Sequence, residues 1–300
     1  MRVLVTGAFG QMDALEARFP DVTFDFWQDE RELVPAPWTY DGVICNALLS
    51  WQDVSTFSNL RFVQLTAAGY DRVPMQALRV RNIRVYNAPN AYAIPMAEAT
   101  VWGVLTLYRK GKAFLASASR HAWEKQRELC ELGGKRVCVI GCGNYGRACA
   151  RLFSAFGCFV VGINRTKETV EGFAEVYEMT RLKEGLRHAD VIISALPLTE
   201  QTRGLLDADA IAACKRGAVL VNLSRGGIVC ERDMINALRS GELGGAVLDV
   251  FETEPLDADS PLWEMENVVI TPHNAFAGDG TAERLLALIC DNLAAERSLL

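Results

Sequence analysis

A glycine-rich turn lies between an apolar strand and a helix near the middle of this 300-residue chain. The strand covers residues 137–140, and the glycines that follow it are Gly141, Gly143 and Gly146. In such a turn one glycine permits the tight bend, one lets the backbone approach a pyrophosphate, and one lets helix pack on strand. The pattern predicts a dinucleotide-binding turn, and its position in mid-chain predicts another domain before it.

Two series of predicted strands alternate with helix-compatible segments. The first series covers residues 3–6, 22–27, 43–45, 62–65 and 83–86. The second covers residues 137–140, 158–163, 191–196, 218–223, 246–250 and 268–271. Such alternation is typical of parallel α/β sheets. We therefore predict an α/β fold with two Rossmann-like or flavodoxin-like domains, the second with six strands in the order 3-2-1-4-5-6.

Two helical segments complete the predicted architecture. Residues 95–117 are apolar on nearly every side, which predicts a buried helix at a subunit interface. Residues 279–300 place Leu285, Ile289 and Leu293 on one apolar face. We assign a substrate-binding domain to residues 1–97 plus 275–300, and a dinucleotide-binding domain to residues 98–274. An active-site cleft is expected between the two domains.

Composition excludes several classes of protein. The net charge is −6 and no basic run occurs, which argues against a nucleic-acid surface. The nine cysteines form no C-x-x-C pair and the three histidines lie far apart, so we expect no metal site and reduced thiols in a cytoplasm. No signal peptide and no apolar stretch of about 18 residues occurs, so we expect no membrane association. Cys142, inside the glycine turn, is either oxidant-sensitive or a small neutral turn residue.

The end of the next strand bears on the choice of cofactor. Here the chain carries Asn164, Arg165 and Thr166, and no carboxylate. An acidic residue at this point would hold the ribose 2′-hydroxyl of NAD, whereas Arg165 can form a charge-assisted bond with a 2′-phosphate. We predict that NADP(H) is preferred, with NAD(H) accepted if Arg165 is only a surface residue. Backbone amides at Asn144 and Tyr145, where the helix starts, are expected to face the phosphates.

Several later segments are similar to those of one enzyme family. Residues 222–227, 248–255 and 271–275 follow or span the ends of the last three predicted strands, where open α/β sheets place their chemistry. These segments, together with residues 196–202 and 66–71, resemble the D-isomer-specific 2-hydroxyacid dehydrogenases, which include phosphoglycerate dehydrogenases and glyoxylate/hydroxypyruvate reductases. The resemblance covers essentially the whole chain and is strongest over residues 134–273.

The resemblance implies that Arg225, Glu254 and His273 are catalytic, and the chemistry of 2-keto acid reduction agrees. His273 can give a proton to the carbonyl oxygen. Glu254 can orient the imidazole and favour its charged form. Arg225 can bind the substrate carboxylate and polarise the ketone. Glu252 is a rival acid, but the family spacing from Asp249 favours Glu254.

The resemblance also implies binding residues. Those expected at the cofactor are Leu196, Pro197, Thr202, Leu223, Ser224 and Asp249, the last beside the nicotinamide carboxamide. The amides of Ala68 and Gly69 resemble a carboxylate-binding loop, where glycine allows close approach. Leu48, Leu49 and Trp51 could form an apolar wall facing the C3 group of a small or hydrophobic substrate, although a core or surface role for Trp51 fits equally well.

We therefore predict an oxidoreductase that transfers hydride between NADP(H) and a small 2-keto or D-2-hydroxy acid, most often reducing the keto acid. The family also implies a homodimer formed through residues 101–115. The alternative is a dinucleotide-sensing or corepressor-like module of the same fold without significant turnover. A short-chain dehydrogenase interpretation rests on the glycines within residues 6–10 and on Tyr108 and Lys112, which mimic that family's catalytic pair. However, the first turn lacks a third glycine, and Gly111 interrupts the helix that should carry the pair.

Overall fold

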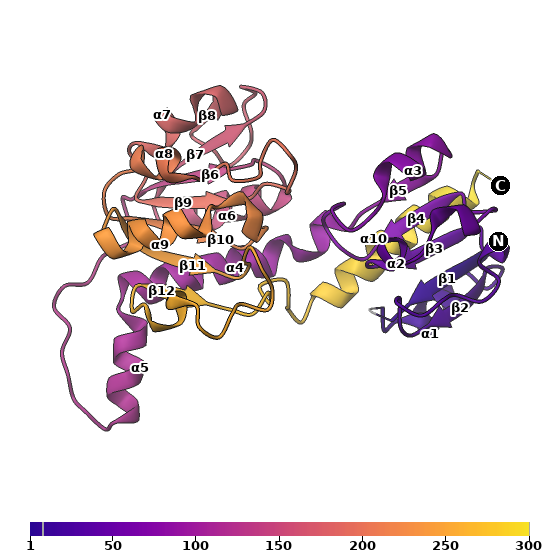
Figure 1. Ribbon diagram of the computed structural model, residues 1–300, viewed down its shortest axis with the longest axis horizontal. Coiled ribbons are helices and arrows are strands. Elements are labelled where there is room, and N and C mark those ends of the chain that lie inside the picture. Colours follow the sequence, from indigo (N-terminus) through magenta and orange to yellow (C-terminus); the bar gives the residue numbers. More distant parts are fainter. Residues whose placement is uncertain (8, 300) are drawn as a thin grey trace. The chain divides into compact units, whose positions relative to one another are not determined.

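The computed structural model describes residues 1–7 and 9–299. The chain forms two compact units (Figure 1), unit 1 from residues 1–92 with 278–300 and unit 2 from residues 93–277. The sequence analysis placed these boundaries at residues 97 and 275. Each unit is built around one parallel sheet, so the predicted α/β fold class is confirmed.

Unit 1 contains a five-stranded parallel sheet in the order β2-β1-β3-β4-β5. Its strands are β1 (Arg2–Thr6), β2 (Thr23–Trp27), β3 (Gly42–Cys45), β4 (Phe62–Leu65) and β5 (Arg84–Tyr86). Its helices are α1 (Met12–Arg18), α2 (Leu48–Trp51), α3 (Met75–Val80) and α10 (Thr281–Arg297), with 3-10 turns η1 (Pro37–Thr39) and η2 (Val54–Thr56). This order is that of a flavodoxin-like sheet. All its strands are parallel, but the chain adds strands first on one side of β1 and then, from β3 onward, on the other.

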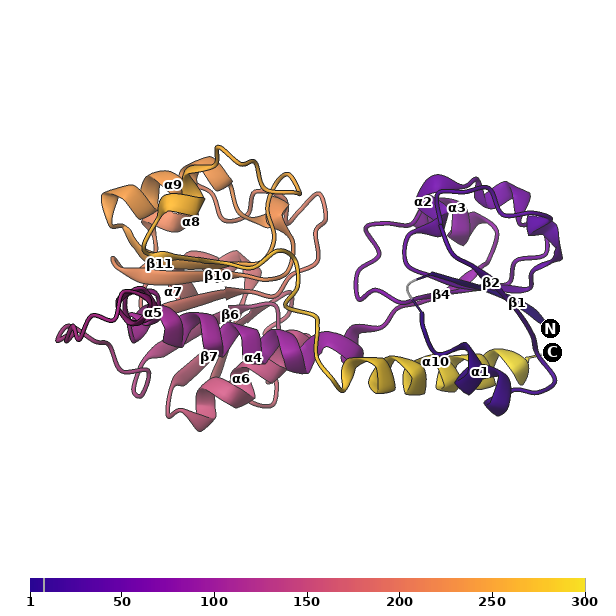
Figure 2. The same ribbon diagram turned by 90° about the horizontal axis from the view of Figure 1, so that it is seen from below.

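Helices cover both faces of the unit 1 sheet. Figure 2 shows α1 and α10 on one face and α2 and α3 on the other. The alternation of side chains along β1 explains this arrangement, because Val3 and Val5 pack in the core with α1 and α10 while Leu4 packs in the core with α2 and α3. The predicted apolar face of the last helix is confirmed, since Leu285 and Ile289 are buried in the first of these cores.

Unit 2 contains a seven-stranded parallel sheet in the order β12-β11-β10-β9-β6-β7-β8. Its strands are β6 (Arg136–Ile140), β7 (Phe159–Asn164), β8 (Glu175–Glu178), β9 (Val191–Ser194), β10 (Ala218–Asn222), β11 (Leu243–Leu248) and β12 (Val268–Ile270). The predicted count of six strands was wrong because it lacked β8. With β8 as the third strand, β9 is the fourth and pairs with β6 on the side opposite β7.

Helices also cover both faces of the unit 2 sheet. They are α4 (Pro89–Tyr108), α5 (Gly111–Ser119), α6 (Asn144–Ala155), α7 (Leu182–Leu186), α8 (Ala208–Ala212) and α9 (Glu231–Ser240), with 3-10 turns η3 (Met179–Arg181), η4 (Gly226–Ile228) and η5 (Pro261–Glu264). Side chains of α4 and α6 pack on one face, and side chains of α7, α8 and α9 pack on the other. The chain passes from unit 1 into unit 2 within α4.

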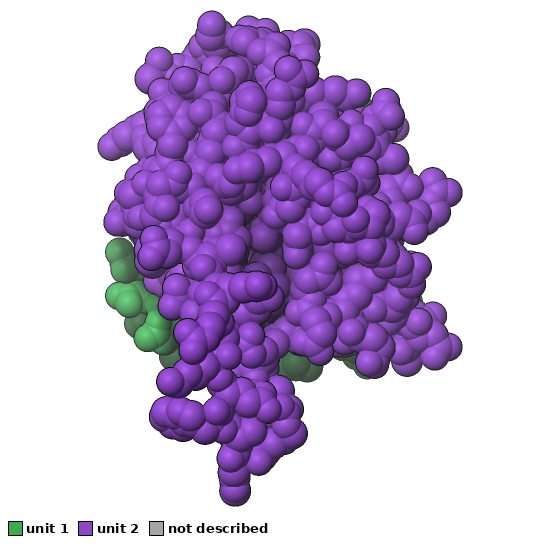
Figure 3. Space-filling model, turned by 90° about the vertical axis from the view of Figure 1, so that its left-hand side faces the viewer, with its two compact units in different colours: residues 1–92, 278–300 green, residues 93–277 purple. Residues whose placement is uncertain are grey.

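The predicted single helix at 95–117 is wrong in two respects. The structure has two helices, α4 and α5, because Lys110 adopts a left-handed conformation with φ of 55°. Burial is also incomplete, since Leu115 is 73% exposed. Helix α5 and the segment 120–134 form an arm that projects from unit 2 (Figures 1 and 3). Over residues 1–7 and 9–299, no helix has both the length and the apolar character needed to cross a membrane.

Candidate active site

The glycine turn joins β6 to α6 with three distinct backbone environments. Gly141 has a φ of 105°, which favours glycine. A Cβ on Gly146 would lie 2.0 Å from the carbonyl oxygen of Gly141, so only glycine allows this packing of α6. A Cβ on Gly143 would meet no heavy atom within 4 Å. The turn therefore leaves space at Gly143, the position where the backbone of such a motif approaches a pyrophosphate.

The residues beside these glycines differ in what they offer a ligand. Asn144 is exposed at the first position of α6. The hydroxyl of Tyr145 pairs with that of Thr100 at 2.7 Å, so its side chain packs inward and only its backbone remains at the turn. Cys142 is buried, and burial raises the pKa of its thiol to about 11. Because the thiolate is the reactive form, these features argue against an oxidant-sensitive Cys142.

The end of β7 is polar and cationic. Asn164 is the last residue of the strand, and Arg165 and Thr166 follow it in exposed positions. Opposite Asn164 in the register lies Glu178, at the end of β8. Glu178 was missed as a neighbour of this site because β8 itself was not predicted.

His273 and Glu254 form a direct contact. The Nδ1 atom of His273 lies 2.6 Å from Oε2 of Glu254, and both side chains are partly exposed. The other carboxylate oxygen of Glu254 accepts a bond from the amide of Phe251 at 3.2 Å. The rival acid, Glu252, instead accepts from the amide of Glu231 at 2.9 Å. The geometry thus pairs the histidine with Glu254, as the spacing predicts.

Asp249 organises the loop that carries His273. Its side chain is 1% exposed and accepts bonds from the Thr271 hydroxyl at 2.5 Å and the amides of Asn274 and Ala275 at 2.8 and 2.9 Å. Its backbone carbonyl accepts from the amide of His273 at 2.8 Å. This network holds His273 in a left-handed conformation with φ of 50°. The carboxylate is thus engaged by the chain itself.

The loop after β10 carries Arg225, Leu223 and Ser224. Arg225 donates to the carbonyl of Ser224 at 2.8 Å, and its own carbonyl accepts from the side chain of Asn222 at 2.9 Å. Asn222 also accepts from the hydroxyl of Ser224 at 3.0 Å, and Ser224 pairs with Ser194 at 3.1 Å. Asn222 and Ser194 therefore fix this loop, although neither was predicted as a site residue.

The loop after β9 folds on itself. The hydroxyl of Thr202 donates to the carbonyl of Pro197 at 2.7 Å and accepts from the amide of Thr199 at 2.8 Å. A side chain of Leu196 lies close to Gly141, at 3.2 Å from a Cβ built there. The hydrogen bonds of Thr202 within the loop indicate that it shapes the loop, and Leu196 brings the loop beside the glycine turn.

In unit 1, the loop after β4 presents backbone amides. Its carbonyls at Thr66, Ala67 and Ala68 accept, in turn, from the hydroxyl of Tyr92, the amide of Ala88 and the side chain of Asn87. The amides of Ala68 and Gly69 donate to no acceptor within residues 1–7 and 9–299. Hydrogen bonds to three successive carbonyls fix the backbone of this loop. The two amides are therefore available to bind an anion.

The predicted apolar wall is wrong. Leu48 and Leu49 are buried in the unit 1 core and face no ligand. Trp51 is 60% exposed, and it lines a pocket with polar and charged neighbours. The remaining two histidines, His121 and His188, are exposed.

The pair that suggested a short-chain dehydrogenase has structural roles. Lys112 donates to the carbonyls of Met265 and Val268, each at 3.0 Å. The Tyr108 hydroxyl points to the carbonyl of Asp190, and burial raises its pKa. The Tyr108–Lys112 pair therefore gives no support to that interpretation.

Similar proteins share this architecture. The family model for the NAD-binding domain of D-isomer specific 2-hydroxyacid dehydrogenases matches residues 101–275. An (S)-sulfolactate dehydrogenase from Chromohalobacter salexigens is 35% identical over 250 residues, which is 80% of this chain and 78% of that protein. A D-3-phosphoglycerate dehydrogenase from Mycobacterium bovis is 36% identical over 225 residues, 75% of this chain but only 42% of that protein.

Solved structures of similar fold cover nearly the whole chain. An NADPH-dependent glyoxylate/hydroxypyruvate reductase from Sinorhizobium meliloti, solved with NADP and sulfate, has a TM-score of 0.81 at 29% identity and covers 100% of this chain and 96% of its own. An acyclic imino acid reductase has a TM-score of 0.88, with 100% and 98% of the two chains covered, but at 21% identity it shows the shared fold alone. The matched segment includes the glycine turn, Arg225 and the His273–Glu254 pair, and the chain belongs to the family of D-isomer specific 2-hydroxyacid dehydrogenases.

Proposed function

We propose that this protein reduces a 2-keto acid to the D-2-hydroxy acid with NADPH. The observation that carries the proposal is the 2.6 Å contact between His273 and Glu254. Both residues follow strands of the sheet that carries the glycine turn, and the loops after parallel strands lie at one edge of a sheet. The space at Gly143, with Gly141 and Gly146 packed tightly beside it, fits a dinucleotide at that edge.

When bound, a nicotinamide cofactor would supply the hydride for C2 of the keto acid. His273 gives the proton from Nε2 to the carbonyl oxygen, while its Nδ1–H donates to Glu254, which fixes the ring and stabilises its charged form. Arg225 binds the carboxylate through its guanidinium and polarises the ketone. We propose the amides of Ala68 and Gly69 as a further group that binds a substrate carboxylate. Asp249 acts as a positioning residue for His273 and lies beside the site proposed for the carboxamide.

NADPH is favoured because Arg165 follows β7 with no carboxylate among residues 164–166. Leu196, Pro197, Thr202, Leu223 and Ser224 complete the proposed cofactor site from the neighbouring loops. Glu178, opposite Asn164, bonds weakly to Thr180 at 3.5 Å. We propose that Arg165 outweighs it in reading the 2′-phosphate, because a guanidinium can bind a phosphate through two hydrogen bonds.

The proposal is tested by following NADPH and NADH oxidation with glyoxylate, hydroxypyruvate and longer 2-keto acids. The wild type should turn over at least one acid and prefer NADPH. Arg165→Gln should raise KM for NADPH by about 10- to 100-fold, the value of a charge-assisted bond, and change KM for NADH little. Arg151→Gln, an exposed change on α6, is the control. Equal effects of Arg165→Gln on both cofactors would refute the 2′-phosphate assignment, and no turnover with either cofactor would refute the reductase.

We also propose a homodimer in the cytoplasm. The arm of α5 and residues 120–134 exposes Phe114, Leu115 and Trp123, an apolar surface that a second copy could cover. All nine cysteines are free thiols, as is usual in a reducing compartment.

A further inference from the structure

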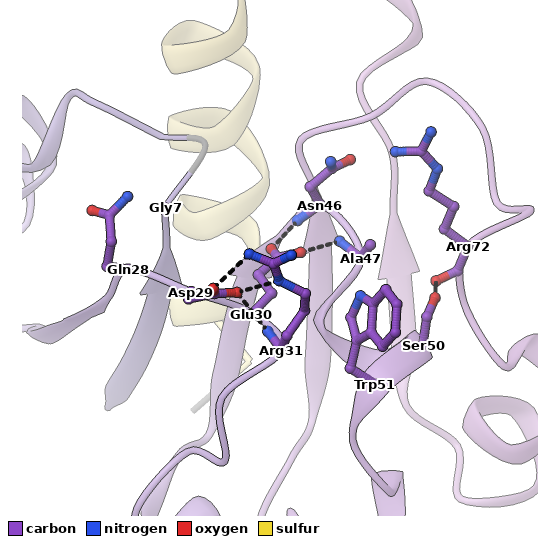
Figure 4. A pocket seen from close by; sticks show the side chains of 10 residues that line it. All are labelled: Gly7, Gln28, Asp29, Glu30, Arg31, Asn46, Ala47, Ser50, Trp51 and Arg72. Atoms are coloured by element: carbon purple, nitrogen blue, oxygen red, sulfur yellow. Dashed lines mark hydrogen bonds and ion pairs between the residues drawn. The ribbon is translucent and has the colours of Figure 1, made fainter. Parts of the chain in front are cut away.

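A pocket of about 500 Å³ opens at the edge of the unit 1 sheet where its strands end. Residues after β1, β2 and β3 line it, together with α2 and the loop after β4 (Figure 4). This place is the switch point of a flavodoxin-like sheet, between β1 and β3, where open α/β sheets bind ligands. The pocket therefore lies where the topology favours a ligand, within unit 1 alone.

The floor of the pocket is held by Glu30. Its carboxylate accepts bonds from the amides of Asn46 and Ala47 at 2.7 and 2.6 Å, and from the hydroxyl of Thr6. Gln52 ties the same loop to α2 through a bond to the carbonyl of Glu32 at 2.8 Å. The carboxylate oxygens of Glu30 are thus occupied by neutral donors of the chain, and hydrogen bonds join the loop to α2.

The formal charges of the lining residues Asp29, Glu30, Arg31 and Arg72 sum to zero, but these residues differ in their partners. Asp29 and Arg31 form a bidentate pair at 2.9 and 2.8 Å, which satisfies both (Figure 4). Arg72 has no side-chain partner within residues 1–7 and 9–299. Its backbone carbonyl accepts from the hydroxyl of Ser50 at 2.5 Å, which ties Arg72 to the turn of α2 that carries Trp51. Arg72 therefore lines the pocket with a guanidinium that none of the described side chains binds, and the exposed Trp51 lines the same pocket.

Arg72 shares its loop with the amides of Ala68 and Gly69. The same short segment after β4 thus offers two separate features for anions, one made of backbone amides and one guanidinium. A substrate with a single carboxylate can use only the first. We infer that the 2-keto acid reduced by this protein carries a second anionic group at its far end, and that Arg72 binds this group in the unit 1 pocket.

This inference rests on the proposed reductase function and replaces the small or hydrophobic substrate expected from the apolar wall. The far group can be a carboxylate, a sulfonate or a phosphate, since all three accept from a guanidinium. Trp51, which is 60% exposed, adds an apolar ring to the lining of the same pocket.

The test compares acids of equal length with NADPH. For wild type, kcat/KM should be at least about 10-fold higher for oxaloacetate than for 2-ketobutyrate, or for 2-ketoglutarate than for 2-ketovalerate. Sulfopyruvate and phosphohydroxypyruvate show whether another anion is preferred. Arg72→Gln should lower this ratio by about 10- to 100-fold. Arg79→Gln, an exposed arginine on α3, should leave the ratio unchanged.

The outcomes separate the two proposals. Turnover of 2-ketobutyrate without any preference for a second anion overturns the inference and leaves the reductase standing. The inference also fails, with the reductase intact, if Arg72→Gln lowers kcat/KM equally for both members of a pair. If the melting temperature of Arg72→Gln equals that of the wild type, the change in the kcat/KM ratio is not caused by misfolding. Absence of turnover with every acid and both cofactors refutes the reductase, and this inference with it.

Discussion

Glu296 is a buried acid that ties the last helix to the edge of the unit 1 sheet. Its side chain is 2% exposed and accepts bonds from the Arg84 guanidinium and from the Tyr86 hydroxyl at 2.7 Å. Burial by itself raises the pKa of Glu296, but the hydrogen bonds from Arg84 and Tyr86 and the charge of Arg84 outweigh burial. The pKa of Glu296 therefore lies below its ordinary value.

Glu296→Gln should lower the free energy of unfolding by about 2 kcal/mol at pH 7, because a charge-assisted bond is lost. A pKa that is lower in the folded chain gives stability that is present above the unfolded value, 4.5, and is lost as the pH falls through the folded value. The difference between wild type and variant in urea unfolding should thus shrink below pH 4.5. Glu283→Gln, exposed on the same helix, is the control. A difference that stays constant down to pH 3 contradicts this account.

The three catalytic residues are predicted from the family resemblance and from their own chemistry. Arg225, Glu254 and His273 each follow a strand, and their types suit the reaction. Ser194 was missed because its partner, Ser224, comes from another segment and meets it only in the fold. Asn222 was missed although its partners, Ser224 and Arg225, follow it closely in the sequence. A signal did exist, since each is the polar last residue of an otherwise apolar strand. Asp249 was named, but its bonds to the His273 loop depend on distances that spacing does not give.

At the scale of the element, two glycines of the turn between β6 and α6 have different roles. Gly146 is needed for packing, and Gly143 leaves space for a ligand. Gly146→Ala should destabilise unit 2 by about 1–3 kcal/mol, because its Cβ would meet the backbone of Gly141. Gly143→Ala should leave the melting temperature nearly unchanged, since its Cβ meets nothing. It should still raise the Kd for NADPH at least about 10-fold by filling the space for the pyrophosphate. Tight binding of NADPH to a stable Gly143→Ala protein, measured by calorimetry, would exclude a pyrophosphate there.

Elements with an apolar pattern were predictable, and those without one were not. The buried strands were located to within a few residues because apolar runs bounded by turns mark them. Strand β8 was missed because it is an edge strand of only four residues. Its two ends, Glu175 and Glu178, are charged and exposed. The break between α4 and α5 lies at the left-handed Lys110, directly before Gly111, the glycine that marks an interruption of the helix in the sequence.

At the scale of the whole molecule, the exposed apolar side chains of the arm lead us to expect that two copies of the chain associate. Leu115→Glu combined with Trp123→Glu should convert a dimer into monomers, because charges would replace side chains that are 73% and 93% exposed. Light scattering at micromolar concentration should give twice the mass of the chain for wild type and the single mass for the variant. Val80→Glu, an exposed apolar residue of unit 1, should remain a dimer. A monomeric wild type would rule out this interface.

The central claim is that His273 and Glu254 act together in proton transfer. The most direct measurement is kcat for NADPH oxidation, with the best acid of the panel, in His273→Ala, Glu254→Gln and Glu252→Gln. The first two should lose about 10²- to 10⁴-fold in kcat while their Kd for NADPH changes little. Glu252→Gln removes an acid that only caps the start of α9 and should keep nearly full kcat. Full activity of Glu254→Gln, or equal losses in Glu254→Gln and Glu252→Gln, would contradict the account.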